Sequence, residues 1–81
     1  MELEKITLII NEFLIEEFEI SEDLIKPDAL LKDDLGLESL DFVDIAVIIE
    51  KEFGIKVKGI EMVNVLTLQD LYNYISLNAP K

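Results

Sequence analysis

The chain has 81 residues, enough for one domain, and its 18 acidic residues against 7 basic ones give a net charge of −11. Because binding nucleic acid requires basic surface that replaces counterions, nucleic acid is not an expected partner. The absence of cysteine and histidine excludes disulfides, thiolate or imidazole metal sites, and Ser–His–Asp or Cys–His catalysis within this chain.

A first helix is predicted from Glu2 to about Phe18. Its apolar residues recur at the spacing of an amphipathic helix, and they are Leu3, Ile6, Ile9, Ile10, Phe13 and Leu14. Glutamates fill most of the other positions. The pattern indicates a core helix with one buried face, and the acidic polar face argues against a helix that binds a membrane surface.

A long connection is expected from Glu19 to Glu38, with short turns of its own. Ser21 is predicted to cap a first turn, which Pro27 prevents from continuing, and Asp28 is predicted to cap a second. Three leucines are apolar enough to hold the connection on the core, namely Leu30, Leu31 and Leu35. A connection of this length is usually packed down, functional, or both.

The main helix is predicted from Leu40 to Phe53, with Ser39 as its N-cap. Gly36 breaks the chain just before it, and Asp41 and Asp44 fall in the first turns, where carboxylates suit the positive end of the helix dipole. A hydroxyl at a helix start lies where free N–H groups favour a phosphate. From the local residues alone, however, plain capping is the routine role for such a serine.

This main helix carries more apolar residues than one buried stripe requires. We assign to the core the stripe made of Phe42, Ile45, Ala46, Ile49 and Phe53. Leu40, Val43 and Val47 are then expected to be partly exposed among acidic residues. Apolar side chains exposed among charges often mark a protein interaction surface, although a loop could also cover them.

The rest of the chain predicts two further helical segments. Gly54 is placed to end the main helix, and Ile60–Asn64 is expected to form a short helix that depends on packing. Thr67 is predicted to cap the last helix, Leu68 to about Leu77. Its inner face is expected to consist of Leu68, Leu71, Tyr72 and Ile75.

The stretch L-G-L-E-S-L-D, which ends at Asp41, resembles the phosphopantetheine attachment motif of acyl carrier proteins, usually written L-G-x-D-S-L. The following V-D-I-A-V-I-I-E-K-E-F-G-I-K-V resembles the second helix of that family. Glu38 stands where aspartate is usual, which keeps the charge and bears on which transferase recognises the chain best. The resemblance covers essentially the whole chain. It implies an all-α four-helix bundle, with three longer helices, a short third helix and a long loop between helices one and two, as a single acyl carrier domain over residues 1–81.

By this resemblance, Ser39 carries a covalent 4′-phosphopantetheine arm that holds acyl groups as thioesters. The chain has no catalytic activity of its own and delivers its cargo to fatty-acid or polyketide-type enzymes. Its expected partners are a phosphopantetheinyl transferase and acyl-transferring and ketosynthase-type enzymes with basic docking surfaces. The residues expected to contact them are Glu38, Leu40, Asp41, Val43, Asp44, Val47, Glu50 and Met62.

The longest uninterrupted apolar run, Ile45 to Ile49, is far shorter than a membrane span. The N-terminal residues also lack the apolar region of a signal peptide. We therefore expect a cytoplasmic monomer without a metal site.

Three alternatives remain open at this point. From the residues alone, a non-covalent acidic interaction module is modestly favoured, and an enzyme with paired carboxylates lacks a phosphate loop or an evident pocket. Among carriers, a peptidyl or aminoacyl carrier is the second choice. Lys51, Lys56 and Lys58 depart from the commonest acyl carriers and hint at a specialised pathway with its own partners.

Overall fold

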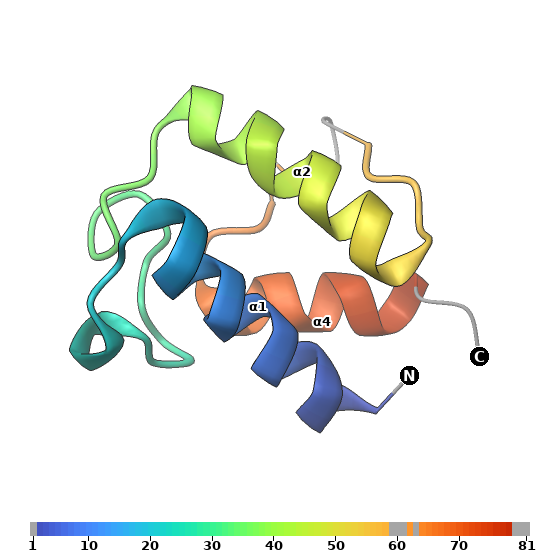
Figure 1. Ribbon diagram of the computed structural model, residues 1–81, viewed down its shortest axis with the longest axis horizontal. Helices are drawn as coiled ribbons and strands as arrows, with labels where there is room; N and C mark the ends of the chain where they lie inside the picture. Colours follow the sequence, from blue (N-terminus) through green and yellow to red (C-terminus); the bar gives the residue numbers. More distant parts are fainter. Residues whose placement is uncertain (1, 59–61, 63, 79–81) are drawn as a thin grey trace.

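The computed structural model describes residues 2–58, 62 and 64–78. Its elements are α1 (Leu3–Phe18), the 3-10 helix η1 (Glu22–Leu24), α2 (Ser39–Phe53) and α4 (Leu68–Asn78). Figure 1 shows α1 and α4 crossing each other, with α2 lying over the pair and the long connection at one end. The all-α prediction is confirmed. The predicted short helix at Ile60–Asn64 falls mainly outside the described residues.

Helix α1 packs against α4. Most of the apolar face that its period predicts is buried, but Leu3 is 45% exposed and Ile9 is only half-buried. Its fully or nearly buried residues are Ile6, Ile10, Phe13 and Leu14. On α4, the predicted inner face is confirmed, because Leu68, Leu71, Tyr72 and Ile75 are all buried. The Tyr72 hydroxyl donates a hydrogen bond to the Asn11 side-chain oxygen, which joins the two helices. Burial raises the pKa of Tyr72 above its usual value, although this hydrogen bond opposes the rise.

Helix α2 presents one stripe to this pair. Ile45 and Ile49 are fully buried, and Phe53 is 3% exposed, as the stripe predicted. Phe42 and Ala46, which were assigned to the same stripe, are only half-buried. Gly54 ends the helix in the left-handed conformation at φ 67°, and its N–H donates to the carbonyl of Glu50 at 3.0 Å. The orientation inferred from the sequence is therefore confirmed for the second half of α2.

The connection between α1 and α2 is bonded to the segment that leads into α4. The N–H of Leu31 donates to the carbonyl of Leu66 at 2.9 Å, and the N–H of Leu68 donates to the carbonyl of Ala29 at 2.9 Å. Leu30 and Thr67 form an isolated antiparallel bridge between these bonds. Two segments more than thirty positions apart are thus held side by side without a sheet.

The two caps predicted within the connection are confirmed only in part, because Ser21 is the N-cap residue of η1 but its side chain makes no cap bond. Neither Ser21 nor Asp28 makes a side-chain hydrogen bond within the described part of the chain. The local acceptor is Asp34, whose carboxylate accepts from the N–H of Leu30 at 2.7 Å. Leu30 is also 39% exposed, whereas the predicted burial of Leu31 and Leu35 is confirmed. A serine or aspartate before a turn matches the sequence pattern of a cap. A carboxylate at the end of the turn, here that of Asp34, can nevertheless accept the N–H hydrogen bond in its place.

The predicted cap of α4 is confirmed and forms a reciprocal pair. The Thr67 hydroxyl accepts from the N–H of Asp70 at 3.1 Å, and the Asp70 carboxylate accepts from the N–H groups of Thr67 at 3.1 Å and Leu66 at 3.2 Å. The bond from the Thr67 N–H is the main reason that the pKa of Asp70 lies below 3.8, and partial desolvation acts in the opposite direction. This carboxylate therefore stabilises the start of α4 in its charged form.

Replacing Asp70 tests this cap. Because its pKa is lowered in the folded state, its contribution to stability is complete above the unfolded value of 3.8 and is lost as the pH falls through the folded value. Asp70→Ala should cost about 0.5–2 kcal/mol at neutral pH, as losing a helix cap does. Urea unfolding at neutral and acid pH should then show a smaller acid-induced loss for the variant than for the parent. If the variant and the parent lose the same free energy of unfolding on acidification, Asp70 does not contribute to the acid sensitivity.

The position of Phe53 at the end of the buried stripe gives a second test. Phe53→Ala should lower the free energy of unfolding by roughly 3–5 kcal/mol, because it leaves a cavity under α2. Urea unfolding followed by circular dichroism measures the change. The matched control is Leu77→Ala, since Leu77 is 85% exposed on α4 and surface changes usually stay within about 0.5 kcal/mol. Equal effects of the two substitutions would contradict the packing of α2.

Candidate functional site

Ser39 is the first residue of α2 and is exposed to solvent. The prediction that it is the N-cap is wrong by one position, because Glu38 has that role. The carbonyl of Glu38 accepts the first helical hydrogen bonds, and its N–H donates to the Asp41 carboxylate at 2.9 Å. No hydrogen bond involves the Ser39 hydroxyl within the described part of the chain. The Ser39 side chain therefore does not cap α2, which is the routine role of a serine at a helix start.

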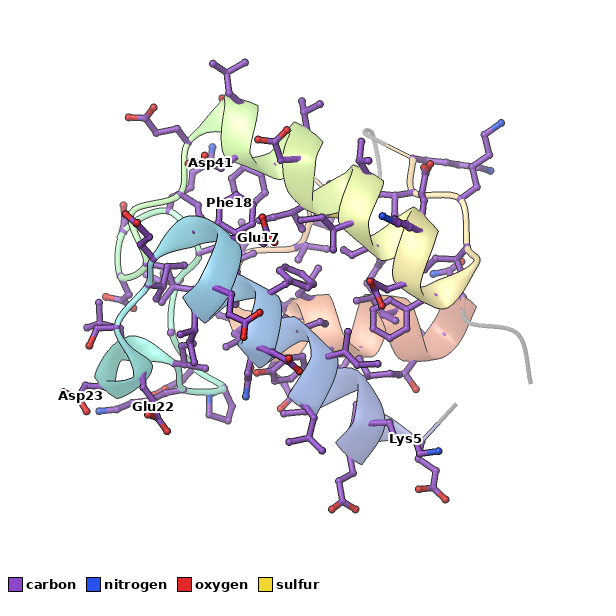
Figure 2. All side chains as sticks on the ribbon, viewed as in Figure 1. Lys5, Glu17, Phe18, Glu22, Asp23 and Asp41 are labelled. Atoms are coloured by element: carbon purple, nitrogen blue, oxygen red, sulfur yellow. The ribbon has the colours of Figure 1, made fainter. Side chains whose placement is uncertain are left out.

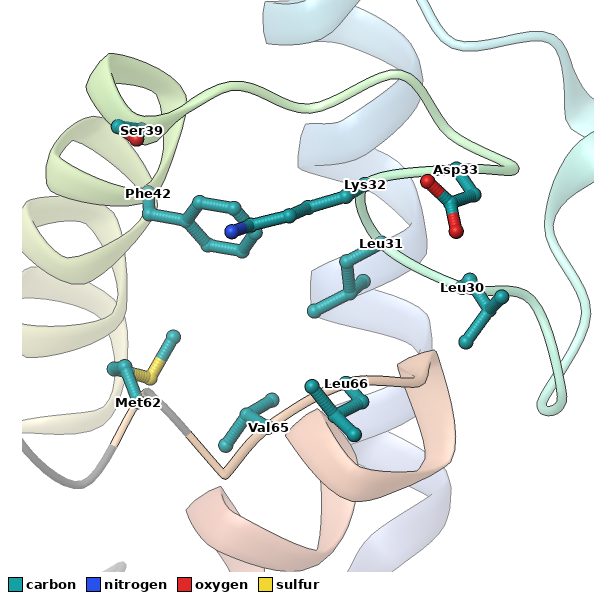
Figure 3. Close-up of a pocket in the computed structure, with 9 residues that line it drawn as sticks. All are labelled: Leu30, Leu31, Lys32, Asp33, Ser39, Phe42, Met62, Val65 and Leu66. Atoms are coloured by element: carbon teal, nitrogen blue, oxygen red, sulfur yellow. The ribbon is translucent and has the colours of Figure 1, made fainter.

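A cavity opens beside Ser39, and we call it the Ser39 pocket. Its volume is about 490 Å³, and its lining consists of Leu30, Leu31, Lys32, Asp33, Ser39, Phe42, Met62, Val65 and Leu66. Figure 3 shows these residues coming from three places: the connection, the first turn of α2, and the stretch before α4. The hydroxyl thus lies at the rim of a mainly apolar cavity.

The walls of the Ser39 pocket explain why Phe42 is only half-buried. Its ring closes one side of the cavity instead of entering the centre of the core. Met62 is half-buried as well and lines the same pocket, so it is partly drawn away from the outer surface where it was expected to meet partners. The pocket has no signature in the sequence, because its walls lie side by side only through the backbone bonds described above.

The exposed apolar stripe predicted on α2 is present. Leu40, Val43 and Val47 are 78%, 61% and 59% exposed, and no described part of the chain covers them. These three residues together with Asp44, which is also exposed, are called the α2 face below. The face begins beside Ser39 and runs along α2 to Val47.

The acidic residues predicted to contact partners differ in their surroundings. Asp41 binds the N–H of Glu38 as described, and the Glu50 carboxylate accepts from the N–H of Val57 at 2.9 Å, in the turn after α2. Glu38 belongs to the capping box of α2, in which its side chain accepts from the backbone N–H of Asp41. By contrast, Asp44 makes no side-chain hydrogen bond within the described residues. Asp41 and Glu50 therefore have structural tasks, and Asp44 is the acid on the α2 face that is free to interact with a partner.

Acidic side chains also surround the rest of the molecule. Figure 2 shows Glu22 and Asp23 pointing outward from η1, and Glu17 and Phe18 at the end of α1. Glu17 and Phe18 line a shallow hollow with Asp44 and Val47 of α2. In the described residues, no group of three carboxylates is placed to hold a metal ion, and no helix has the length and apolar character needed to cross a membrane.

An exposed serine at the start of a helix, free of hydrogen bonds and at the rim of an apolar cavity, is suited to carrying a prosthetic arm. The phosphopantetheine attachment site family matches residues 9–75. An acyl carrier protein of Campylobacter hominis is 30% identical over 73 residues, which cover 89% of this chain and 92% of that protein. The acyl carrier protein AcpXL of Rhizobium meliloti is 48% identical over 48 residues, which cover 59% of this chain and 50% of that protein.

The chain therefore belongs to the acyl carrier protein family, whose members carry covalently attached 4′-phosphopantetheine. This finding confirms the family resemblance of the L-G-L-E-S-L-D stretch. The residues around Ser39 fit such a group, because an exposed hydroxyl and an adjoining cavity are both present.

Proposed function

We propose that Ser39 carries the arm and that this chain, as one carrier domain over residues 1–81, delivers acyl thioesters to fatty-acid or polyketide-type enzymes. The observation that carries the assignment is the Ser39 hydroxyl, which is exposed and makes no hydrogen bond at the rim of the Ser39 pocket. The curated relatives named above are acyl carrier proteins, so neither a peptidyl or aminoacyl carrier nor a non-covalent acidic module is favoured.

Attachment of the arm is a phosphoryl transfer carried out by a separate transferase. The Ser39 oxygen forms a bond to the phosphorus of coenzyme A next to pantetheine, the pyrophosphate bond breaks, and adenosine bisphosphate leaves. The hydroxyl proton passes to a base of the transferase. The start of α2 favours the resulting phosphodiester, because the helix dipole and the first-turn N–H groups attract negative charge.

The bound arm supplies a thiol that holds the acyl group as a thioester. Helix α2 fixes where the arm begins, and the Ser39 pocket offers apolar volume that shields part of the arm or cargo from water. Tethering then raises the local concentration of the cargo at each enzyme that docks beside Ser39. The catalytic groups belong to those enzymes, and the carrier works in the cytoplasm as a monomer.

Docking uses the α2 face. Its exposed apolar residues offer a contact that excludes water, and the net charge of −11 attracts enzymes with basic surfaces. Because Asp44 is not engaged elsewhere, it is the acid on this face best placed to steer a partner toward Ser39.

Intact-protein mass spectrometry tests the assignment of Ser39. After incubation with coenzyme A and a phosphopantetheinyl transferase, the parent chain should gain the mass of one arm, and Ser39→Ala should gain none. Since the hydroxyl makes no hydrogen bond, Ser39→Ala should also leave the melting temperature nearly unchanged. Ser21→Ala is the matched control and should be modified like the parent. An arm on Ser39→Ala would disprove the assignment.

Binding kinetics test the α2 face. Asp44→Lys should slow association with a basic partner enzyme and weaken its salt dependence, because rim charges act mainly on the association rate. Val43→Ala should speed dissociation, because buried apolar contacts act mainly on the lifetime of the complex. Surface plasmon resonance with the transferase measures both rates.

The controls for this experiment carry the same kind of change elsewhere. Glu22→Lys alters the net charge as Asp44→Lys does, but it lies on η1. Leu8→Ala truncates an apolar side chain that is 63% exposed on α1. If each control changes the kinetics as much as its counterpart, partners do not dock on the α2 face.

A further inference from the structure

Lys32 is the one cation that lines the Ser39 pocket within the described part of the chain. Figure 3 shows its side chain extending from the connection toward α2, the helix that carries Phe42 and Ser39. Asp33 lines the pocket too, but it stays on the side of the connection. In a chain with 18 acidic residues, a lysine directed to this place needs an explanation.

The backbone at Lys32 is fixed by its neighbours. Its carbonyl accepts from the N–H of Gly36 at 3.1 Å, and Gly36 has the positive φ of 71° that such a turn ending requires. The preceding Leu31 is 1% exposed and bonded through its N–H to the carbonyl of Leu66. The backbone of Lys32 therefore fixes where its side chain begins. The side chain itself is exposed, so its ammonium can move between different contacts.

The ammonium of Lys32 is not committed to any acid in the part of the chain that the structure describes. No ion pair involves it within the described residues. Two nearby carboxylates already bind backbone N–H groups: Asp34 binds that of Leu30, and Asp41 binds that of Glu38. A positive charge at the rim of this cavity is thus available to an anion that arrives there.

We propose that Lys32 is a positioning residue that binds the phosphodiester formed on Ser39. This inference rests on the proposed function, because the phosphate is joined directly to the Ser39 oxygen and must lie at the same rim. A lysine ammonium binds phosphate as a compact point charge. It offsets the repulsion between the phosphate and the acids at the start of α2, and it draws the first part of the arm over the pocket instead of into solvent.

The expected strength of the ion pair between Lys32 and the phosphodiester makes the interaction reversible. An exposed ion pair contributes about 0.2–1 kcal/mol, which favours the held arm by roughly 1.4- to 5-fold over the free arm. Such a bias organises the arm without locking it. A basic enzyme surface that docks on the α2 face competes for the same phosphate, so docking itself releases the arm from Lys32.

Phosphorus NMR of the arm-bearing protein tests the proposal. Lys32→Met keeps the apolar stem and removes the charge, so its phosphorus line should be narrower than that of the parent. Added salt should narrow the parent line and leave the Lys32→Met line unchanged, because salt screens an exposed pair. Lys32→Arg should restore the parent behaviour. Lys26→Met, an exposed lysine of the same connection that does not line the pocket, is the matched control.

Mass spectrometry is run first on every variant, so a failure of attachment at Ser39 is seen separately from a failure of this inference. Equal line widths and equal salt responses for the parent and Lys32→Met, with both proteins fully modified, would overturn the proposal. If Lys32→Met changes only the melting temperature of the arm-free protein, Lys32 serves the Phe42 ring through a cation–π contact, and the proposal is also wrong.

Discussion

The backbone hydrogen bonds between the connection and the segment before α4 are the constraint on which the site depends. They join Leu31 to Leu66 and Ala29 to Leu68, and a further bond runs from the N–H of Gln69 to the carbonyl of Pro27 at 2.8 Å. These bonds fix the long connection against the segment before α4, as firmly as packing fixes a helix. Without them, the Ser39 pocket would lack the wall that faces α2, and Lys32 would have no fixed starting point.

Periodicity predicted the helices well, because burial of one face decides both the pattern and the structure. It also separated the buried Ile45, Ile49 and Phe53 from the exposed stripe of the same helix. The cap at Ser39 was misplaced by one position, because two adjacent residues can each begin a helix and the Asp41 carboxylate decides between them by binding the N–H of Glu38. The pocket could not be predicted, since its walls meet through long-range backbone bonds that leave no periodic signal.

The acidic residues do two kinds of work. Asp34, Asp41, Glu50 and Asp70 each accept a backbone N–H and so define where a turn or helix begins or ends. Asp44 has no such partner in the described residues and contributes to the long-range field. Composition gives the total charge but cannot separate these groups, because the distinction depends on which N–H lies within reach of each carboxylate.

The origin of the pocket walls bears on how this family member can adapt. Two of the lining residues, Leu30 and Leu66, are 39% and 61% exposed, so changing their size leaves the packed centre of the bundle intact. Apart from Ser39 and Phe42 of α2, the walls come from segments between the helices, whereas the packed helix faces supply most of the stability. Mutation at these two positions can therefore enlarge or narrow the cavity at little cost to folding, while the exposed face of α2 stays the same.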